Sequence, residues 1–258
     1  MPHWIVSADV FSEFNRECGA LDASELRARL EAKAIAADDY FLPGQGLTEA
    51  DYADIEALAR HNGFDEAFHF WRPFPNGPRA PRSLTHKHQP YNSLISIPQE
   101  QPDGSFRANL LISTGNELIS DHVTGQHVQG MVLVEACRQM FIAVSELCHM
   151  EHEDGRRSYV VFNKMEVAFK AFTFPIPAVI EYRALSCTSP RSDRMSITAQ
   201  LNVMQNETVT TTLAVDYTLF NATRLQQKEV AMGIKAVKTY AGFHASTLQA
   251  RALQQAAE

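Results

Sequence analysis

The sequence has few cysteines and no long apolar run, and both absences exclude whole classes of protein. Its four cysteines, Cys18, Cys137, Cys148 and Cys187, show no CxxC spacing, which disfavours a disulfide framework or a cysteine-rich zinc site. The N-terminus, MPHWIVSADVFSEF, lacks the basic stretch and apolar run of a secretory signal. The most apolar segment, residues 130–148, carries Glu135 and Arg138 at its centre, so we expect no membrane span. We therefore predict a reduced, cytoplasmic protein.

The chain also lacks an excess of basic residues. Its formal net charge is −7 and its pI is about 5.8, whereas nucleic-acid binders need a basic surface to offset phosphate charge. No GxSxG elbow, P-loop or GxGxxG motif is present. We accordingly expect neither a nucleic-acid partner nor a cofactor.

Three parts can be distinguished along the chain. Residues 1–72 are predicted to be helical, with Asp22 as one N-cap and a second helix running from Thr48 to a stop at Gly63. A proline-rich stretch up to about residue 83 links this part to the next. The predicted organisation is an N-terminal helical region at 1–80, a main domain at 84–221 and a C-terminal helical extension at 222–258, broken at Gly233 and Gly242.

The main domain has the pattern of an α+β fold. Strands are predicted at residues 92–97, 106–113, 159–169, 178–187, 194–204 and 208–220. Short turns, such as Asn206-Glu207, separate the last strands without intervening helices, which indicates an antiparallel sheet. The order is therefore two strands, one long helix and four strands.

The long helix at 130–148 is apolar nearly all round, whereas a surface helix is apolar on one stripe only. A sheet that curls around one helix would bury it, and this is the hotdog arrangement. Glu135, Arg138 and Gln139 are spaced i, i+3 and i+4, so they share one helix face. Two readings remain open for that face: a structural Glu135–Arg138 ion pair at a subunit interface, or an active-site cleft.

The start of this helix is a candidate binding site. Gly130 begins it, so the free N–H groups of the first turn and the positive end of the helix dipole face whatever lies beside residues 122–129. A thioester carbonyl suits this position, because its oxygen gains negative charge on nucleophilic attack.

The stretch from Gln126 to Gln139, QHVQGMVLVEACRQ, resembles the A-factor biosynthesis (AfsA) hotdog family, and more distantly the PGxxxxEAxxQ signature of FabA/FabZ-type hotdog dehydratases. Residues 85–90 and 162–167 resemble flanking segments of the AfsA family. The sequence departs from the family at Gln129, where the family has proline, and at Gln126, where it has aspartate. Only one hotdog is found where family members commonly carry two, so a homodimer is expected.

The resemblance implies an acyltransferase that moves a β-ketoacyl group from a carrier-protein or coenzyme A thioester to a small hydroxylated acceptor such as dihydroxyacetone phosphate. The acceptor hydroxyl needs a base, for which His127 or Glu135 is a candidate, and Arg138 could bind an acceptor phosphate or an oxyanion. Gly130, Met131, Gln139 and His122 are the candidate substrate-binding residues.

Other activities fit the same fold. Asp121-His122-Val-Thr-Gly125 is similar to the turn that carries the catalytic histidine of FabZ-like dehydratases, so dehydration of a 3-hydroxyacyl thioester is the first alternative. A thioesterase or a non-catalytic acyl-binding module are the others.

No metal site is expected. His86 and His88 would face one side of a strand and could bind a metal, but no third ligand is evident, which favours a solvated strand start. The run from Cys148 to Glu153 is expected to be an exposed turn at the helix end.

Overall fold

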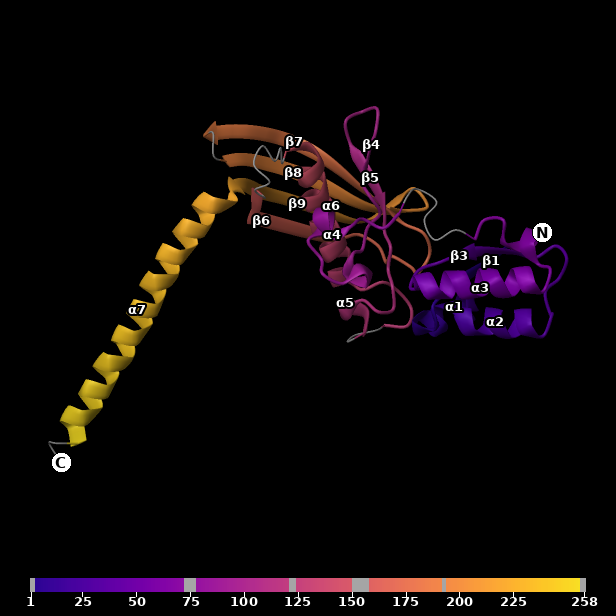
Figure 1. Cartoon of the computed structure of the whole chain (residues 1–258), viewed down its shortest axis with the longest axis horizontal. Helices are drawn as coiled ribbons and strands as arrows, with labels where there is room; N and C mark the ends of the chain where they lie inside the picture. The colour runs from indigo at the N-terminus through magenta and orange to yellow at the C-terminus, as the bar shows by residue number, and fades with distance from the viewer. Residues whose placement is uncertain (1–2, 72–77, 121–123, 150–157, 192–193, 256–258) are drawn as a thin grey trace.

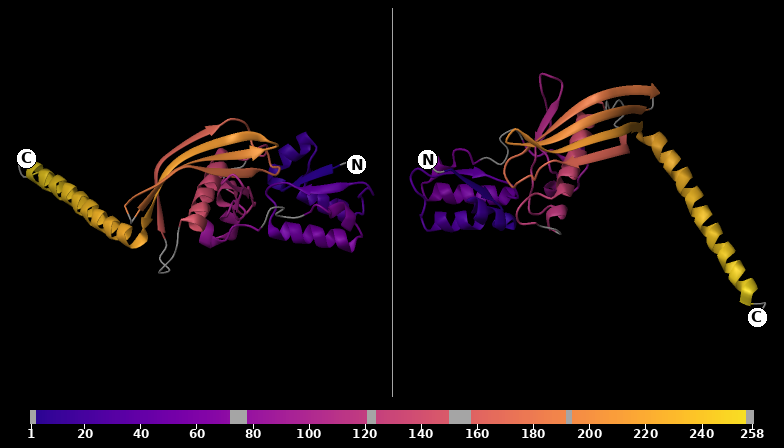
Figure 2. Two further views of the ribbon diagram at one scale, coloured as in Figure 1. Left: turned by 90° about the horizontal axis from the view of Figure 1, so that it is seen from above. Right: turned by 180° about the vertical axis from the view of Figure 1, so that it is seen from behind.

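A curved antiparallel sheet around one long helix forms the larger part of the protein (Figure 1). The computed structural model describes residues 3–71, 78–120, 124–149, 158–191 and 194–255. The helix, α6 (Gly130–Cys148), lies in the concave face of a six-stranded sheet of order β4-β5-β7-β8-β9-β6, as the turned views in Figure 2 show. The predicted hotdog arrangement is therefore confirmed.

The strands of this sheet are joined by short connections where no helix intervenes. They are β4 (Gln99–Glu100), β5 (Phe106–Asn109), β6 (Ser158–Phe169), β7 (Val179–Arg191), β8 (Arg194–Gln205) and β9 (Thr208–Asn221). Asn206 and Glu207 connect β8 to β9 with φ angles of 48° and 64°, which match a two-residue hairpin turn that twists with its strands. The four strands predicted after the helix are confirmed.

The strand predicted at residues 92–97 is wrong. A short helix η3 (Pro90–Asn92) is followed by single bridges, Ser96 with Arg79 and Ile95 with Leu110. The physical reason is that side chains take part of the backbone pairing of this segment. The Gln139 side chain accepts from the N–H of Leu94, so that group does not enter a strand ladder.

Helix α6 is buried along most of its length because the sheet wraps it. Met140 and Phe141 are fully buried, and the Phe141 ring lies 4.8 Å from that of Tyr217 on β9. The Tyr217 hydroxyl is 3.0 Å from the Ser145 hydroxyl of α6, so this internal polar group is satisfied.

The N-terminal module, described over residues 3–71, contains a sheet that the sequence interpretation missed. Three parallel strands, β1 (His3–Ser7), β2 (Leu21–Asp22) and β3 (Tyr40–Pro43), lie in the order β2-β1-β3. The prediction of a purely helical region is wrong because these strands have two to five residues and are too short to show alternation. The helices are η1 (Asp9–Phe11), α1 (Ser12–Cys18), α2 (Ala23–Glu31), α3 (Glu49–His61) and η2 (Asp65–Phe68).

The two predicted helix starts in this module differ in outcome. Thr48 caps α3 through a reciprocal pair of hydrogen bonds with Asp51, and Gly63 follows the helix with φ 78°, as predicted. Asp22 is the N-cap of α2 but makes no side-chain cap bond, because its Oδ1 accepts from Asn15 Nδ2 at 2.7 Å.

The N-terminal module is docked firmly on the hotdog. Ser7 Oγ donates to the carbonyl of Pro175 at 2.7 Å, and the N–H of Gln45 donates to the same carbonyl at 2.9 Å. The Gln45 side chain accepts from the N–H of Ile112 and donates to the carbonyl of Leu110, both at 2.9 Å. A Cβ added at Gly44 would lie 2.2 Å from Ser7 Oγ, so only glycine allows this close approach.

Three further helices complete the described chain. Two are short, α4 (Arg82–Thr85) and α5 (Glu117–Ser120). The third, α7 (Ala222–Gln255), is one continuous helix that extends away from the sheet (Figures 1 and 2). The breaks predicted at Gly233 and Gly242 are wrong, because glycine in a helix costs only about 1 kcal/mol and the flanking residues are good helix formers. In the described ranges, no helix has both the length and the apolar character needed to cross a bilayer.

Candidate active site

The first turn of α6 leaves backbone donors available. Gln129 is its N-cap, and the structure records no acceptor among the described residues for the N–H groups of Gly130 and Met131. A Cβ at Gly130 would lie 2.7 Å from the ring of Phe169, so glycine is required for this packing. Met131 is 62% exposed, which leaves the helix start accessible. Hydrogen-bond donors beside a positive helix end can bind a developing oxyanion.

Five residues into the helix, Glu135 is the centre of a charged cluster. Arg138 donates to both of its carboxylate oxygens, at 2.7 and 2.9 Å, and Gln139 Nε2 donates to Oε1 at 3.0 Å. The structure therefore brings together the three residues that were predicted to share a face. It adds a fourth, because Lys87 Nζ lies 2.8 Å from Glu135 Oε1.

Lys87 was missed by the sequence reasoning. It follows α4, far from Glu135 along the chain, and α4 packs on α6. No periodicity links two such distant positions. The available signal was the segment 85–90, whose resemblance to the AfsA family could have marked it as part of the site.

The electrostatics of Glu135 follow from this cluster. Burial favours the neutral acid, but the hydrogen bonds from Arg138, Gln139 and Lys87 outweigh it and lower the pKa of Glu135 to about 2. Glu135 is therefore a carboxylate at neutral pH and a poor proton acceptor. Two cations share one anion here, which leaves a net charge of +1 on the partly exposed face of α6.

Gln139 connects the cluster to the preceding segment of chain. Its Nε2 also donates to the carbonyl of Asn92 at 2.8 Å, and its Oε1 accepts from the N–H of Leu94 at 2.7 Å. The side chain is fully buried. Gln139 thus fixes residues 92–94 against α6 and orients Glu135.

His127 lies before the helix start and makes no recorded contact with Glu135. Its ring centroid is 4.6 Å from that of Phe172, and Thr124 Oγ1 bonds to its backbone N–H and carbonyl. His122, the other candidate, lies outside the described residues.

The histidines around Lys87 do not form the predicted strand. His86 ends α4 with φ 58°, so the expected alternation of His86 and His88 along a strand is wrong. The ring of His86 instead contacts the buried carboxylate of Glu146 on α6. Among the described residues no group of three metal-ligand side chains is found, and residues 150–153 of the run after Cys148 lie outside the described ranges.

A hollow of about 200 Å³ lies beside Lys87. Four cationic or titratable basic side chains line it, with one acid, in the set Arg79, Arg82, Lys87, His88 and Glu49. Arg and Lys side chains at such a position favour an anionic ligand. The hollow is small enough to select a compact molecule.

Comparisons with known proteins agree with this architecture. The sequence profile of the A-factor biosynthesis hotdog domain (AfsA) matches residues 74–221. A mutant thioesterase from Pseudomonas aeruginosa is similar in structure, with a TM-score of 0.40 and 11% identity over 58% of this chain and 99% of that one. The ApeI:P dehydratase heterocomplex from Xenorhabdus doucetiae gives 0.41 and 16%, over 57% of this chain and 93% of that one. No curated protein matches the sequence.

Proposed function

Because the chain belongs to the A-factor biosynthesis hotdog domain family, we propose that it transfers a β-ketoacyl group from a carrier-protein or coenzyme A thioester to a small hydroxylated acceptor. The observation that carries the choice of an acyltransferase is the excess positive charge around Glu135. Lys87 and Arg138 both pair with it, and Lys87 also lines the basic hollow. An acceptor that bears a phosphate would be attracted to such a surface.

The helix start is the proposed site of the thioester carbonyl. The N–H groups of Gly130 and Met131 would bind its oxygen as charge develops there. The acceptor oxygen attacks the carbonyl carbon while His127 takes its proton. The tetrahedral intermediate then collapses, the C–S bond breaks, and the thiolate leaves and takes up the proton from His127.

Glu135 has a different role in this proposal from the one that its sequence position suggested. With a pKa of about 2 it holds Lys87 and Arg138 in place rather than accepting a proton. Gln139, buried and bonded to residues 92 and 94, positions Glu135 and does not itself touch the substrate.

A homodimer is part of the proposal. The strand β6 is one edge of the sheet, and it has large exposed side chains, Tyr159 at 50%, Phe162 at 43% and Phe169 at 57%. Edge strands of this length favour pairing with another strand. A dimer formed there would also cover the start of α6, since Phe169 packs on Gly130. Sedimentation analysis of wild type and of Tyr159→Lys tests this point, and a wild-type monomer would contradict it.

The activity is tested by incubating the protein with a β-ketoacyl thioester, with and without dihydroxyacetone phosphate, and identifying the products by mass spectrometry. An acyl ester of the acceptor supports the proposal. A free acid would identify a thioesterase, loss of water from a 3-hydroxyacyl thioester would identify a dehydratase, and a thioester that binds unchanged would identify a non-catalytic module.

The site assignment is tested with Lys87→Met, Arg138→Ala and Glu135→Ala. Each should lower kcat/KM for acyl transfer by about 100-fold or more, because each removes charge from the acceptor site. Lys164→Met is the matched control, since Lys164 is an exposed lysine paired with Glu166 on β6. If the site variants fold and keep wild-type turnover while Lys164→Met does too, the assignment is wrong.

A further inference from the structure

A second, larger cavity lies between the N-terminal module and the hotdog. Its volume is about 310 Å³, and its walls are mainly apolar, with contributions from both parts of the chain: Ile5, Leu42, Phe70, Leu111, Ile112 and Ala178. None of the residues proposed for acyl transfer lines it. It is therefore a separate site, and it has the lower end of the volume range of small-molecule pockets.

The cavity is preformed, because the contacts that border it are fixed. Gln45 lines it and at the same time bonds to Leu110 and Ile112. On the other side of the junction, Ser7 and the backbone of Gln45 share the carbonyl of Pro175. A ligand would enter without first ordering its walls, which lowers the entropic cost of binding.

Two polar side chains reach this apolar cavity, Tyr52 and Arg79. The Tyr52 hydroxyl has no recorded hydrogen bond to any described residue, and its ring is held by Trp71, whose Nε1 donates to the Tyr52 carbonyl. Burial raises the pKa of Tyr52 well above its usual value, so the hydroxyl remains a donor at neutral pH. Arg79 is anchored through Nη1 to the carbonyls of Ser93 and Leu111.

We propose that this cavity binds a medium-chain carboxylic acid, with its alkyl tail against the apolar walls and its carboxylate on Arg79 and the Tyr52 hydroxyl. A guanidinium and a neutral hydroxyl together provide charge-assisted donors for one carboxylate. The acid nearest to Arg79, Glu49, lines the smaller hollow and not this cavity. The proposal does not depend on the acyl-transfer reaction.

The test is calorimetric titration of the full-length protein with octanoate, and with octanol as a probe that has the same tail and no carboxylate. Octanoate should bind at one site per chain, and octanol about tenfold more weakly, because it lacks the charged group. Leu42→Trp fills the cavity and should abolish binding. Tyr40→Trp is the matched control, since it places the same side chain on the same strand outside the cavity and should keep wild-type affinity.

Two more variants address the polar end. Tyr52→Phe keeps the ring and should weaken octanoate binding severalfold while leaving octanol unchanged, and Glu135→Gln should leave both unchanged. Octanoate that fails to bind wild type, or that binds Leu42→Trp as well as it binds Tyr40→Trp, would overturn the proposal. Equal affinity for octanoate and octanol would overturn the assignment of Arg79 and Tyr52.

Discussion

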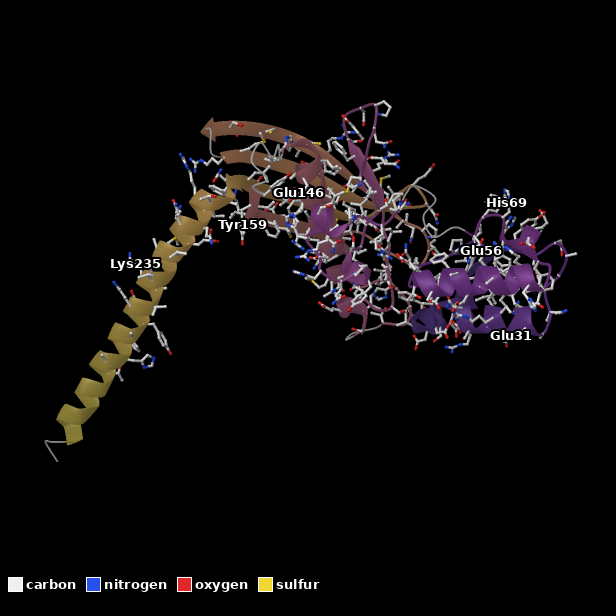
Figure 3. The ribbon with its side chains drawn as sticks, viewed as in Figure 1. Glu31, Glu56, His69, Glu146, Tyr159 and Lys235 are labelled. Atoms are coloured by element: carbon white, nitrogen blue, oxygen red, sulfur yellow. The ribbon has the colours of Figure 1, made fainter. Side chains whose placement is uncertain are left out.

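Helices α6 and α7 are both long and both carry large apolar side chains, yet one is enclosed and the other projects from the molecule. Phe141 on α6 is fully buried, whereas Val237, Tyr240 and Phe243 on α7 are 69–70% exposed. Figure 3 shows Glu146 of α6 among side chains of neighbouring elements, whereas Lys235 of α7 has only side chains of its own helix around it. The position in the chain explains the difference, because α6 precedes four strands that wrap it and α7 follows the last of them.

The two helices should accordingly derive their stability from different sources. Packing against the sheet stabilises α6, whereas α7 depends on local helix propensity and on its few contacts near β6 and β9. Apolar composition alone therefore does not predict burial. What the rest of the chain can place around a helix decides it.

The largest expected difference is between two phenylalanine substitutions. Phe141→Ala should lower the free energy of unfolding by about 3–5 kcal/mol, because it leaves a cavity under the sheet. Phe243→Ala should change it by less than about 0.5 kcal/mol, because the ring is exposed. Urea denaturation of both variants measures this. A large loss for Phe243→Ala would show that α7 is covered in solution.

A smaller effect is expected from acid. The pKa of Glu135 is about 2 in the folded protein against an ordinary value of 4.5, so its ionisation stabilises the fold above pH 4.5. That contribution is lost as the pH falls from about 4.5 to about 2, and we expect a loss of about 1–3 kcal/mol that Glu135→Gln does not show. Glu229→Gln, on the exposed surface of α7, is the control and should keep the wild-type slope. Parallel slopes for all three proteins would contradict the Glu135 cluster.

The smallest effects concern one glycine in each helix. Gly130→Ala should destabilise the protein by about 1–2 kcal/mol, because the new methyl group meets the Phe169 ring. Gly233→Ala meets no atom within 4 Å and should raise helix stability by up to about 1 kcal/mol. Denaturation measures the first and far-ultraviolet circular dichroism the second. Changes of the same sign would mean that the two helices have similar surroundings.

Much of the hotdog could be predicted because its signals are local. The apolar run of α6 and the alternation in β6 to β9 each extend over at least a dozen residues, which is long enough to identify their periods. The short parallel strands of the N-terminal module are below that length. The segment 92–97 has strand-like composition, but a side chain from α6 changes its pairing, and no local pattern reports that.

The candidate site was predictable only where its residues lie on one element. Glu135, Arg138 and Gln139 follow from helical spacing, which is a property of neighbouring positions. Lys87 joins them only through the packing of α4 on α6, and the low pKa that results changes the chemistry expected of Glu135. Tertiary contacts therefore determined both the fourth member of the cluster and the role of the first.

The side chain of Gln45 has a consequence for where this protein can be divided. Its amide occupies the place of a peptide unit, because it satisfies one carbonyl and one N–H of the segment that extends beyond β5. A fragment that began where the family resemblance begins, at residue 74, would leave both groups buried without a partner. The unit that evolution has shared among relatives is thus shorter than the unit that must fold together, and a minimal stable version of this hotdog has to retain the N-terminal module.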